Sequence, residues 1–160
     1  MVHEGKIQGV KWKELRVHTD DRGFLTELLR ADDEFFGVEF AGFGQTTLTM
    51  SYPGVIKAFH WHHHQDDAWV VVKGMIQAVL YDQRKDSPTY GITETYCMGD
   101  QWRILLVIPR GVVHGYRVLG NEPAWVVYHT TVPYNPDCPD EERVPYDDPT
   151  IGFDWTIRPR

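Results

Sequence analysis

The chain has 160 residues, of which 42% are hydrophobic and 24% charged, a composition typical of one globular domain and not of a disordered chain. The net charge of -7 argues against nucleic acid as a partner, because phosphate binding needs a basic surface. No stretch approaches the roughly 20 apolar residues that span a bilayer, only Cys97 and Cys138 are present, and no apolar leader begins the chain, so we expect a cytoplasmic protein without a membrane partner.

Strand signals dominate the chain. Phe24–Glu39 could hold one or two helical turns, although Gly37 limits them. Six short segments rich in β-branched and aromatic residues, bounded by Gly, Pro or Asp, are predicted strands: Val55–His60, Ala68–Lys73, Met75–Asp82, Thr93–Met98, Arg103–Ile108 and Ala124–Thr131. Their length and spacing predict an all-β sandwich, jelly roll or barrel in a single domain spanning residues 1–160. From about residue 133, Pro, Asp and Glu crowd the chain, which predicts an irregular surface arm.

A group of histidines lies where the first of these strands ends. Side chains alternate along a strand, so His60, His62 and His64 are expected on one face. Asp67 opens the next predicted strand, and His114 follows a tight Pro-x-Gly turn. Either these side chains converge in the barrel interior, or the histidine run is a solvated strand end.

The spacing of this group resembles the two motifs of the cupin superfamily, with an Asp where the acidic position is usually Glu. The resemblance implies a double-stranded β-helix. In many cupins the matching positions, here His60, His62, Asp67 and His114, hold Fe, Mn, Zn or Ni. Three imidazoles and a carboxylate suit such divalent transition metals chemically.

Longer segments resemble one cupin family. They follow the order of that family over about residues 15 to 155: 18–27, 54–60, 81–91, 108–116, 128–134 and 147–155. Together they resemble dTDP-4-dehydrorhamnose 3,5-epimerase, the RmlC-type cupin of deoxysugar biosynthesis. The resemblance implies a cofactor-free epimerase of a nucleotide-linked 4-keto-6-deoxy sugar. A base removes a proton next to the ketone on one face, and an acid returns it on the other.

The same resemblance implies roles for individual residues. His60 matches the base and Tyr128 the proton donor. Substrate contacts match six positions: Arg22, Glu27, Lys57, His114, Tyr134 and Glu141. Arg22 and Glu27 often reach the site of a partner subunit in relatives, so we expect a homodimer. Core packing is the alternative role of the two tyrosines, and a turn-stabilising ion pair with Asp20 or Asp21 is the alternative role of Arg22.

Three departures from the family keep a second hypothesis open. Lys57 stands where relatives have Arg, and Asp67 where they have Lys. Relatives also orient the base with an Asp from a C-terminal tail, and here Asp67 is the nearest candidate by sequence. The alternative to the epimerase is therefore a metal-binding cupin, either an enzyme or a small-molecule binding module. A metal ion on His60 would remove the free base, so the two mechanisms exclude each other.

Overall fold

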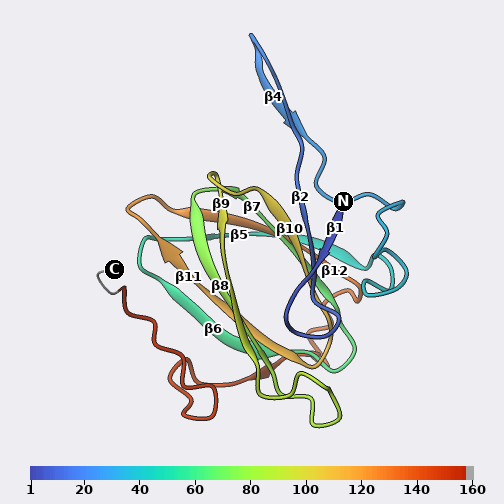
Figure 1. Ribbon diagram of the computed structural model, residues 1–160, viewed down its shortest axis with the longest axis vertical. Helices are drawn as coiled ribbons and strands as arrows, with labels where there is room; N and C mark the ends of the chain where they lie inside the picture. The colour runs from blue at the N-terminus through green and yellow to red at the C-terminus, as the bar shows by residue number, and fades with distance from the viewer. Residues whose placement is uncertain (158–160) are drawn as a thin grey trace.

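Two antiparallel sheets packed face to face form the body of the protein (Figure 1). The computed structural model describes residues 1–157, and within them every regular element is a strand. In spatial order, the six-stranded sheet contains β1 (Val2–Glu4), β2 (Lys11–Glu14), β10 (Ile104–Ile108), β7 (Asp67–Lys73), β12 (Ala124–Thr130) and β5 (Gln45–Ser51). The five-stranded sheet contains β13 (Glu142–Arg143), β6 (Ile56–Trp61), β11 (Val112–Leu119), β8 (Met75–Asp82) and β9 (Thr93–Gly99). A separate hairpin pairs β3 (Val17–Asp20) with β4 (Gly23–Thr26).

The core lies between the two sheets, and a second apolar cluster covers part of the outer face of the six-stranded sheet. Side chains such as Ile76, Leu80 and Leu106 fill the space between the sheets. On the other side of β10 and β7, Phe35 and Phe40 pack against strand residues. Because both faces of β10 are covered, this strand is a continuous buried apolar run instead of an alternating one.

The predicted all-β double-stranded β-helix is confirmed, and each of the six predicted strands occurs within one or two residues of its expected bounds. Strands β1 to β5, β11 and β13 were not predicted. Along β5 Thr alternates with Leu and Met in the period-two pattern of a strand, but here Thr47 and Thr49 face the cavity while Leu48 and Met50 are exposed.

The predicted helical turns in Phe24–Glu39 are absent, so that prediction is wrong. β4 occupies the start of the segment, and tight turns follow it. Gly37 adopts a φ of 81°, which ends any helical continuation there. The tight turns of this segment bring Phe35 and Phe40 together in the apolar cluster on the outer face of the six-stranded sheet.

The segment from about residue 133 is mostly irregular, but it is bound to the body along β6. Two backbone hydrogen bonds of 2.8 and 2.9 Å join Val144 to Phe59, and Glu142 pairs with Trp61 in the sheet. The ring of Trp155 packs on that of Phe59 at 5.4 Å between centroids. The arm therefore forms part of the wall of the molecule.

β6 and β11 approach each other unusually closely. Their register shifts between His114 and Tyr116, and a Cβ atom at Gly115 would lie 2.5 Å from the Cβ of Ala58. Only glycine allows this approach. Since His114 is the direct cross-strand partner of His60, the close pairing brings two histidines from distant parts of the chain together.

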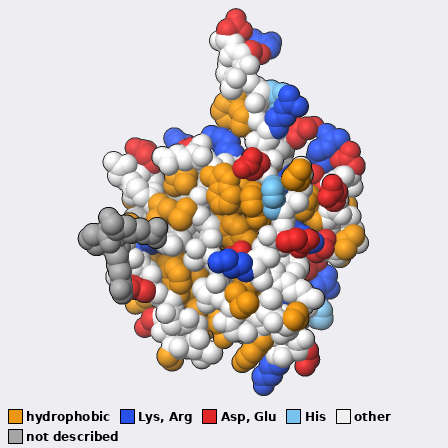
Figure 2. All heavy atoms as spheres, in the orientation of Figure 1, with side chains coloured by type: hydrophobic (Ala, Val, Ile, Leu, Met, Phe, Trp, Pro, Cys, Tyr) orange, Lys and Arg blue, Asp and Glu red, His pale blue; other side chains and the backbone are white. Residues whose placement is uncertain are grey.

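The β3–β4 hairpin stands clear of the body, with charged side chains gathered at its tip (Figures 1 and 2). Phe24 is 57% exposed and Leu25 62% exposed. Within residues 1–157 there is no helix of the length and apolarity needed to cross a membrane.

Candidate active site

A cavity of about 850 Å³ opens between the two sheets. The six-stranded sheet contributes Trp69 and Tyr128, and the five-stranded sheet contributes Lys57 and His60. The C-terminal arm closes one side with a run of residues from 132 to 141. The cavity is therefore lined by the two sheets and by the C-terminal arm, so its residues come from segments that are far apart in the sequence.

His60 lies near the end of β6 and is only partly accessible from the cavity. Its ring meets that of His114 edge-on, with 4.2 Å between centroids. Burial, reinforced by the proximity of His114, holds the pKa of His60 well below the ordinary value of 6.5. The imidazole is therefore neutral at neutral pH, which is the form that accepts a proton.

Tyr128 faces the cavity from β12, on the other sheet. Burial raises the pKa of Tyr128 above 10.0, and the negative charge of Asp67 raises it further. The phenol therefore keeps its proton at neutral pH and is able to donate it. Tyr128 is the cross-strand partner of Thr47 on β5 and of Trp69 on β7. Because side chains alternate along a strand, Tyr128 points to the inner face of the sheet.

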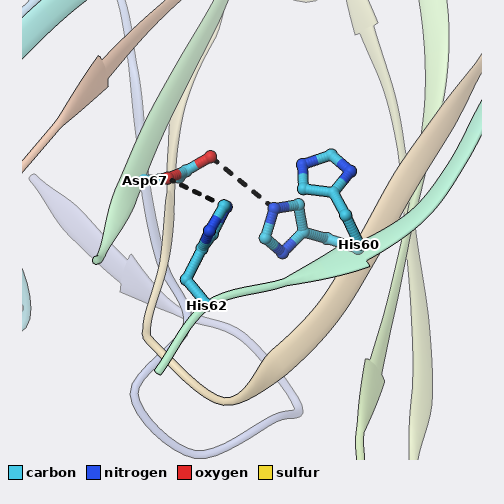
Figure 3. Close-up of side chains that lie close together, drawn as sticks. His60, His62 and Asp67 are labelled. Atoms are coloured by element: carbon cyan, nitrogen blue, oxygen red, sulfur yellow. Dashed lines mark ion pairs between the residues drawn. The ribbon is translucent and has the colours of Figure 1, made fainter. Parts of the chain in front are cut away.

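Asp67 is buried and faces two histidines across the gap between the sheets (Figure 3). Its carboxylate oxygens lie 3.9 Å from Nε2 of His62 and 3.6 Å from Nε2 of His114. The Gln65 amide donates to Oδ1 at 2.7 Å, and the Trp69 indole donates to Oδ2 at 2.9 Å. Burial alone would raise the pKa of Asp67, but His114, His62 and Trp69 together hold it below its ordinary value, so Asp67 is ionised.

The four candidate metal ligands do converge. One donor atom from each of His60, His62, Asp67 and His114 lies within 4.8 Å of the others. Nε2 of His114 is buried without a hydrogen-bond partner among the described residues. This donor set fits a divalent transition metal, and such an ion would act as a Lewis acid on a nearby carbonyl oxygen.

Three of the six residues predicted to contact substrate line the cavity. Lys57, Tyr134 and Glu141 do so, and Lys57 Nζ donates to the Thr49 hydroxyl at 2.9 Å. His114 does not line the cavity: it is 1% exposed and lies beneath His60, with Nδ1 donating to the carbonyl of Val112 at 2.9 Å. In this chain His114 therefore packs beneath the His60 ring.

Arg22 and Glu27 lie outside the cavity of their own chain. Arg22 is on the projecting hairpin and pairs with Asp20, as the alternative explanation anticipated. Glu27 follows the hairpin and pairs with Arg30 at 2.7 Å. A contact from either residue to a bound substrate would have to be made in another copy of the chain.

The expected face shared by His60, His62 and His64 is only partly correct. β6 ends at Trp61, so strand alternation stops before His64, which is exposed in the loop that follows. Sequence reasoning also missed Gln65 and Asp140, which hold this loop and the buried cluster in place. Asp140 carries no local sequence signal, because its contacts join segments 75 residues apart, whereas the Gln65 side chain acts locally on His62 and Asp67.

Comparison with known proteins identifies the family. The family model of dTDP-4-dehydrorhamnose 3,5-epimerase matches residues 4–160. The chain belongs to this epimerase family. It is 55% identical over 149 residues to the spore coat polysaccharide biosynthesis protein SpsL of Bacillus subtilis, covering 93% of this chain and 96% of that protein. It is also 38% identical to the probable low-salt glycan biosynthesis epimerase Agl13 of Haloferax volcanii, covering 93% and 94% of the two chains.

Solved structures of the epimerase family have the same fold. A dTDP sugar isomerase from Desulfovibrio desulfuricans aligns with a TM-score of 0.83 at 33% identity, covering 93% of this chain and 92% of that one. An epimerase from Legionella pneumophila, solved with dTDP-4-keto-L-rhamnose, aligns with a TM-score of 0.86 at 28% identity, covering 99% and 84%. These matches support the prediction of a sugar-nucleotide epimerase and do not favour the alternative of a metal-binding cupin.

Proposed function

We propose that this chain epimerises a dTDP-linked 4-keto-6-deoxy sugar at C3, C5 or both. The observation that carries the proposal is the placement of His60 and Tyr128 on opposite sheets, facing one cavity. Inversion of a carbon centre needs a base on one face of the sugar and an acid on the other. A neutral imidazole and a protonated phenol satisfy that requirement at neutral pH.

The reaction follows from the acidity of a C–H bond next to a ketone. His60 takes the proton, and the electron pair of the C–H bond moves into the carbonyl to form an enolate. Tyr128 then returns a proton to the opposite face of the same carbon as the carbonyl re-forms. Both side chains regain their starting protonation by exchange with water, so the overall change is an inversion with no net loss of atoms.

Lys57 is the candidate contact for the diphosphate of the substrate. It is the only Lys or Arg among the described residues that line the cavity. A diphosphate carries more charge than one ammonium group compensates. A second cation from another subunit would complete the site, and Arg22 on the hairpin is the candidate.

We propose that the protein acts as a homodimer, with the β3–β4 hairpin of one copy reaching the cavity of the other. Two-stranded hairpins are only marginally stable on their own, so a projecting hairpin with exposed apolar side chains is expected to pack against a partner.

We also propose that the protein is located in the cytoplasm, where it can meet its nucleotide-linked substrate. The described part of the chain has no helix long and apolar enough to cross a membrane.

We further propose that catalysis needs no resident metal, because His60 must keep a free nitrogen to act as the base. Exhaustive dialysis against EDTA is expected to leave the rate of epimerisation unchanged. If elemental analysis instead finds near one equivalent of a transition metal, and activity is lost with the metal, the proposed mechanism is wrong.

Solvent deuterium exchange tests the proposal directly. In D₂O the wild-type protein is expected to incorporate deuterium at C3, C5 or both of dTDP-4-keto-6-deoxyglucose. Proton NMR measures this incorporation as the loss of the corresponding proton signals. His60→Ala is expected to slow exchange about 10²–10⁴-fold, the range of a positioned acid or base. Absence of exchange with the wild-type protein would show that this substrate is wrong.

A further inference from the structure

We propose that Asp140, on the C-terminal arm, is a positioning residue that holds His62 in one tautomer and thereby orders the buried cluster beside His60. The kinetic part of this inference rests on the proposed epimerase function. The structural part concerns the loop between β6 and β7, residues 62–66, and can be measured without any substrate.

The side chain of Asp140 acts as an anchor for that loop. Oδ1 accepts the backbone N–H of His63 at 2.9 Å. Oδ2 accepts the backbone N–H groups of His64 at 2.9 Å and Gln65 at 3.0 Å. Three consecutive N–H groups therefore converge on one carboxylate, and these bonds hold the pKa of Asp140 below its ordinary value although burial acts in the other direction.

The main-chain carbonyl of Asp140 determines the tautomer of His62. Nδ1 of His62 donates to this carbonyl oxygen, which can only accept a hydrogen bond. The proton of the neutral imidazole is therefore on Nδ1, and Nε2 carries a free lone pair. The carboxylate of Asp140 fixes the loop, and the carbonyl of the same residue fixes the ring that the loop carries.

The tautomer of His62 affects Asp67 through hydrogen bonds made by Gln65. The amide nitrogen of Gln65 lies 3.3 Å from Nε2 of His62 and 2.7 Å from Oδ1 of Asp67, so it donates one hydrogen to each. If His62 carried its proton on Nε2, the Gln65 amide would meet another donor and would have to turn away. Asp67 would then lose a partner and shift.

The cluster matters for His60 because it packs directly against that ring. The His60 and His62 rings lie 5.4 Å apart, and the charge of Asp67 favours the protonated form of His60 once it accepts a proton. A small movement of catalytic groups can cost about a hundredfold in rate. Asp140 therefore acts on the base through His62, Gln65 and Asp67 without touching it.

The test compares Asp140→Ala and Asp140→Asn with Glu142→Gln. Glu142 is the matched control: it is an exposed carboxylate two residues along, it does not line the cavity, and it reaches the loop only through the His63 ring at 3.4 Å. Long-range ¹H–¹⁵N NMR reports the tautomer of His62, and amide hydrogen exchange reports the protection of residues 63–65. Deuterium exchange into the keto sugar gives kcat and KM.

We expect Asp140→Ala to expose the three loop amides, to populate the Nε2–H tautomer of His62, and to lower kcat about 10- to 100-fold. Asp140→Asn keeps one accepting oxygen and should fall between wild type and Asp140→Ala, which leaves a usable variant if the alanine protein does not fold. Glu142→Gln should match wild type in all three measurements.

The inference is overturned if the Asp140 variants keep the Nδ1–H tautomer and the loop protection, whatever happens to kcat. It is equally overturned if the tautomer changes while kcat stays within about twofold of an active wild type. If the wild-type protein is inactive but Asp140→Ala still shifts the tautomer, the positioning role holds and the proposed function fails. The two ideas are therefore tested separately.

Discussion

Two partly buried side chains with opposite protonation preferences, His60 and Tyr128, face the same cavity. Burial destabilises a charge, so it keeps the His60 imidazole neutral and the Tyr128 phenol protonated. A base and an acid are thus ready at neutral pH without any further group. The charge of the ionised Asp67 holds the proton on Tyr128 more firmly, and it partly offsets the cost of protonating His60.

The pKa of His60 determines how activity depends on pH. Because the folded-state pKa lies well below 6.5, His60 remains a competent base until the pH falls through that lower value. We expect kcat/KM to be flat around pH 6.5 and to decline only at more acidic pH. A pH–rate profile measured by deuterium exchange, within the range where the protein stays folded by circular dichroism, checks this. An acidic limb centred at or above 6.5 would contradict it.

Replacement of Tyr128 by Phe separates the two proton transfers. The substitution keeps the aromatic ring but removes the donor, so His60 can still take a proton and return it to the same face. We expect Tyr128→Phe to retain deuterium exchange while inversion falls at least about a hundredfold. Proton NMR of one reaction mixture measures both. Equal loss of exchange and inversion would mean that Tyr128 is not the opposite-face donor.

Among the elements, the turn between β8 and β9 has a structural role, although it lies in one of the segments by which the sequence resembles the family. The buried carboxylate of Asp82 accepts from Arg84 Nε at 2.8 Å, the Ser87 hydroxyl at 2.6 Å and the Thr89 hydroxyl at 2.6 Å. Arg84 also donates to the carbonyl of Gln8 at 2.7 Å, which ties the N-terminal segment to this turn. None of these residues lines the cavity.

Asp82→Asn is expected to reduce stability and to leave the cavity intact. Burial raises the pKa of Asp82, but its bonds to Arg84, Ser87 and Thr89 outweigh this and lower it below 3.8. The stabilisation is therefore present above pH 3.8 and is lost as the pH falls through the lower folded-state pKa. We expect a loss of about 1.5–3 kcal/mol at pH 7, the range for a hydrogen bond to a charged group, and a smaller difference from wild type below pH 3.8.

Urea unfolding at pH 7 and at a series of lower pH values measures that difference. Kinetic constants of the folded variant should stay within about twofold of wild type. A difference between the two proteins that does not change with pH would show that the charge of Asp82 is not responsible for the stabilisation.

At the scale of the whole molecule, two surfaces of the described chain present exposed apolar side chains. One is the β3–β4 hairpin. The other lies on the outward face of β5 and β12, where Leu48, Met50 and Trp125 are exposed and Trp125 is the cross-strand partner of Met50. β5 is also the edge of the six-stranded sheet, and an edge strand with an apolar face is a common site of association.

Leu25→Asp tests whether the hairpin carries the dimer. A charge at this 62% exposed position should be tolerated by an isolated chain but not inside an apolar interface. We expect light scattering to find a monomer, with activity reduced because Arg22 no longer reaches a second cavity. Tyr90→Asp, an exposed aromatic in the loop between β8 and β9, is the control and should remain dimeric. A dimeric Leu25→Asp would rule out the hairpin as the main contact.

From the sequence alone, six of the thirteen described strands, the fold class and the family could be predicted, and His60 and Tyr128 could be named as the candidate base and acid. These features depend on local alternation, on turn residues and on motif spacing, which a linear chain records directly. His60, Asp67 and His114 could be grouped because the motif spacing fixes their relative places.

Only the tertiary structure decided how those residues work together. The packing of two sheets placed His60 opposite Tyr128, and the close approach of β6 and β11 at Gly115 put His114 beneath His60 instead of in the cavity wall. The arm became part of the site because Asp140 binds a loop 75 residues away. Such contacts join segments that are distant in the sequence. They form only when the whole chain packs, so no local sequence pattern predicts them.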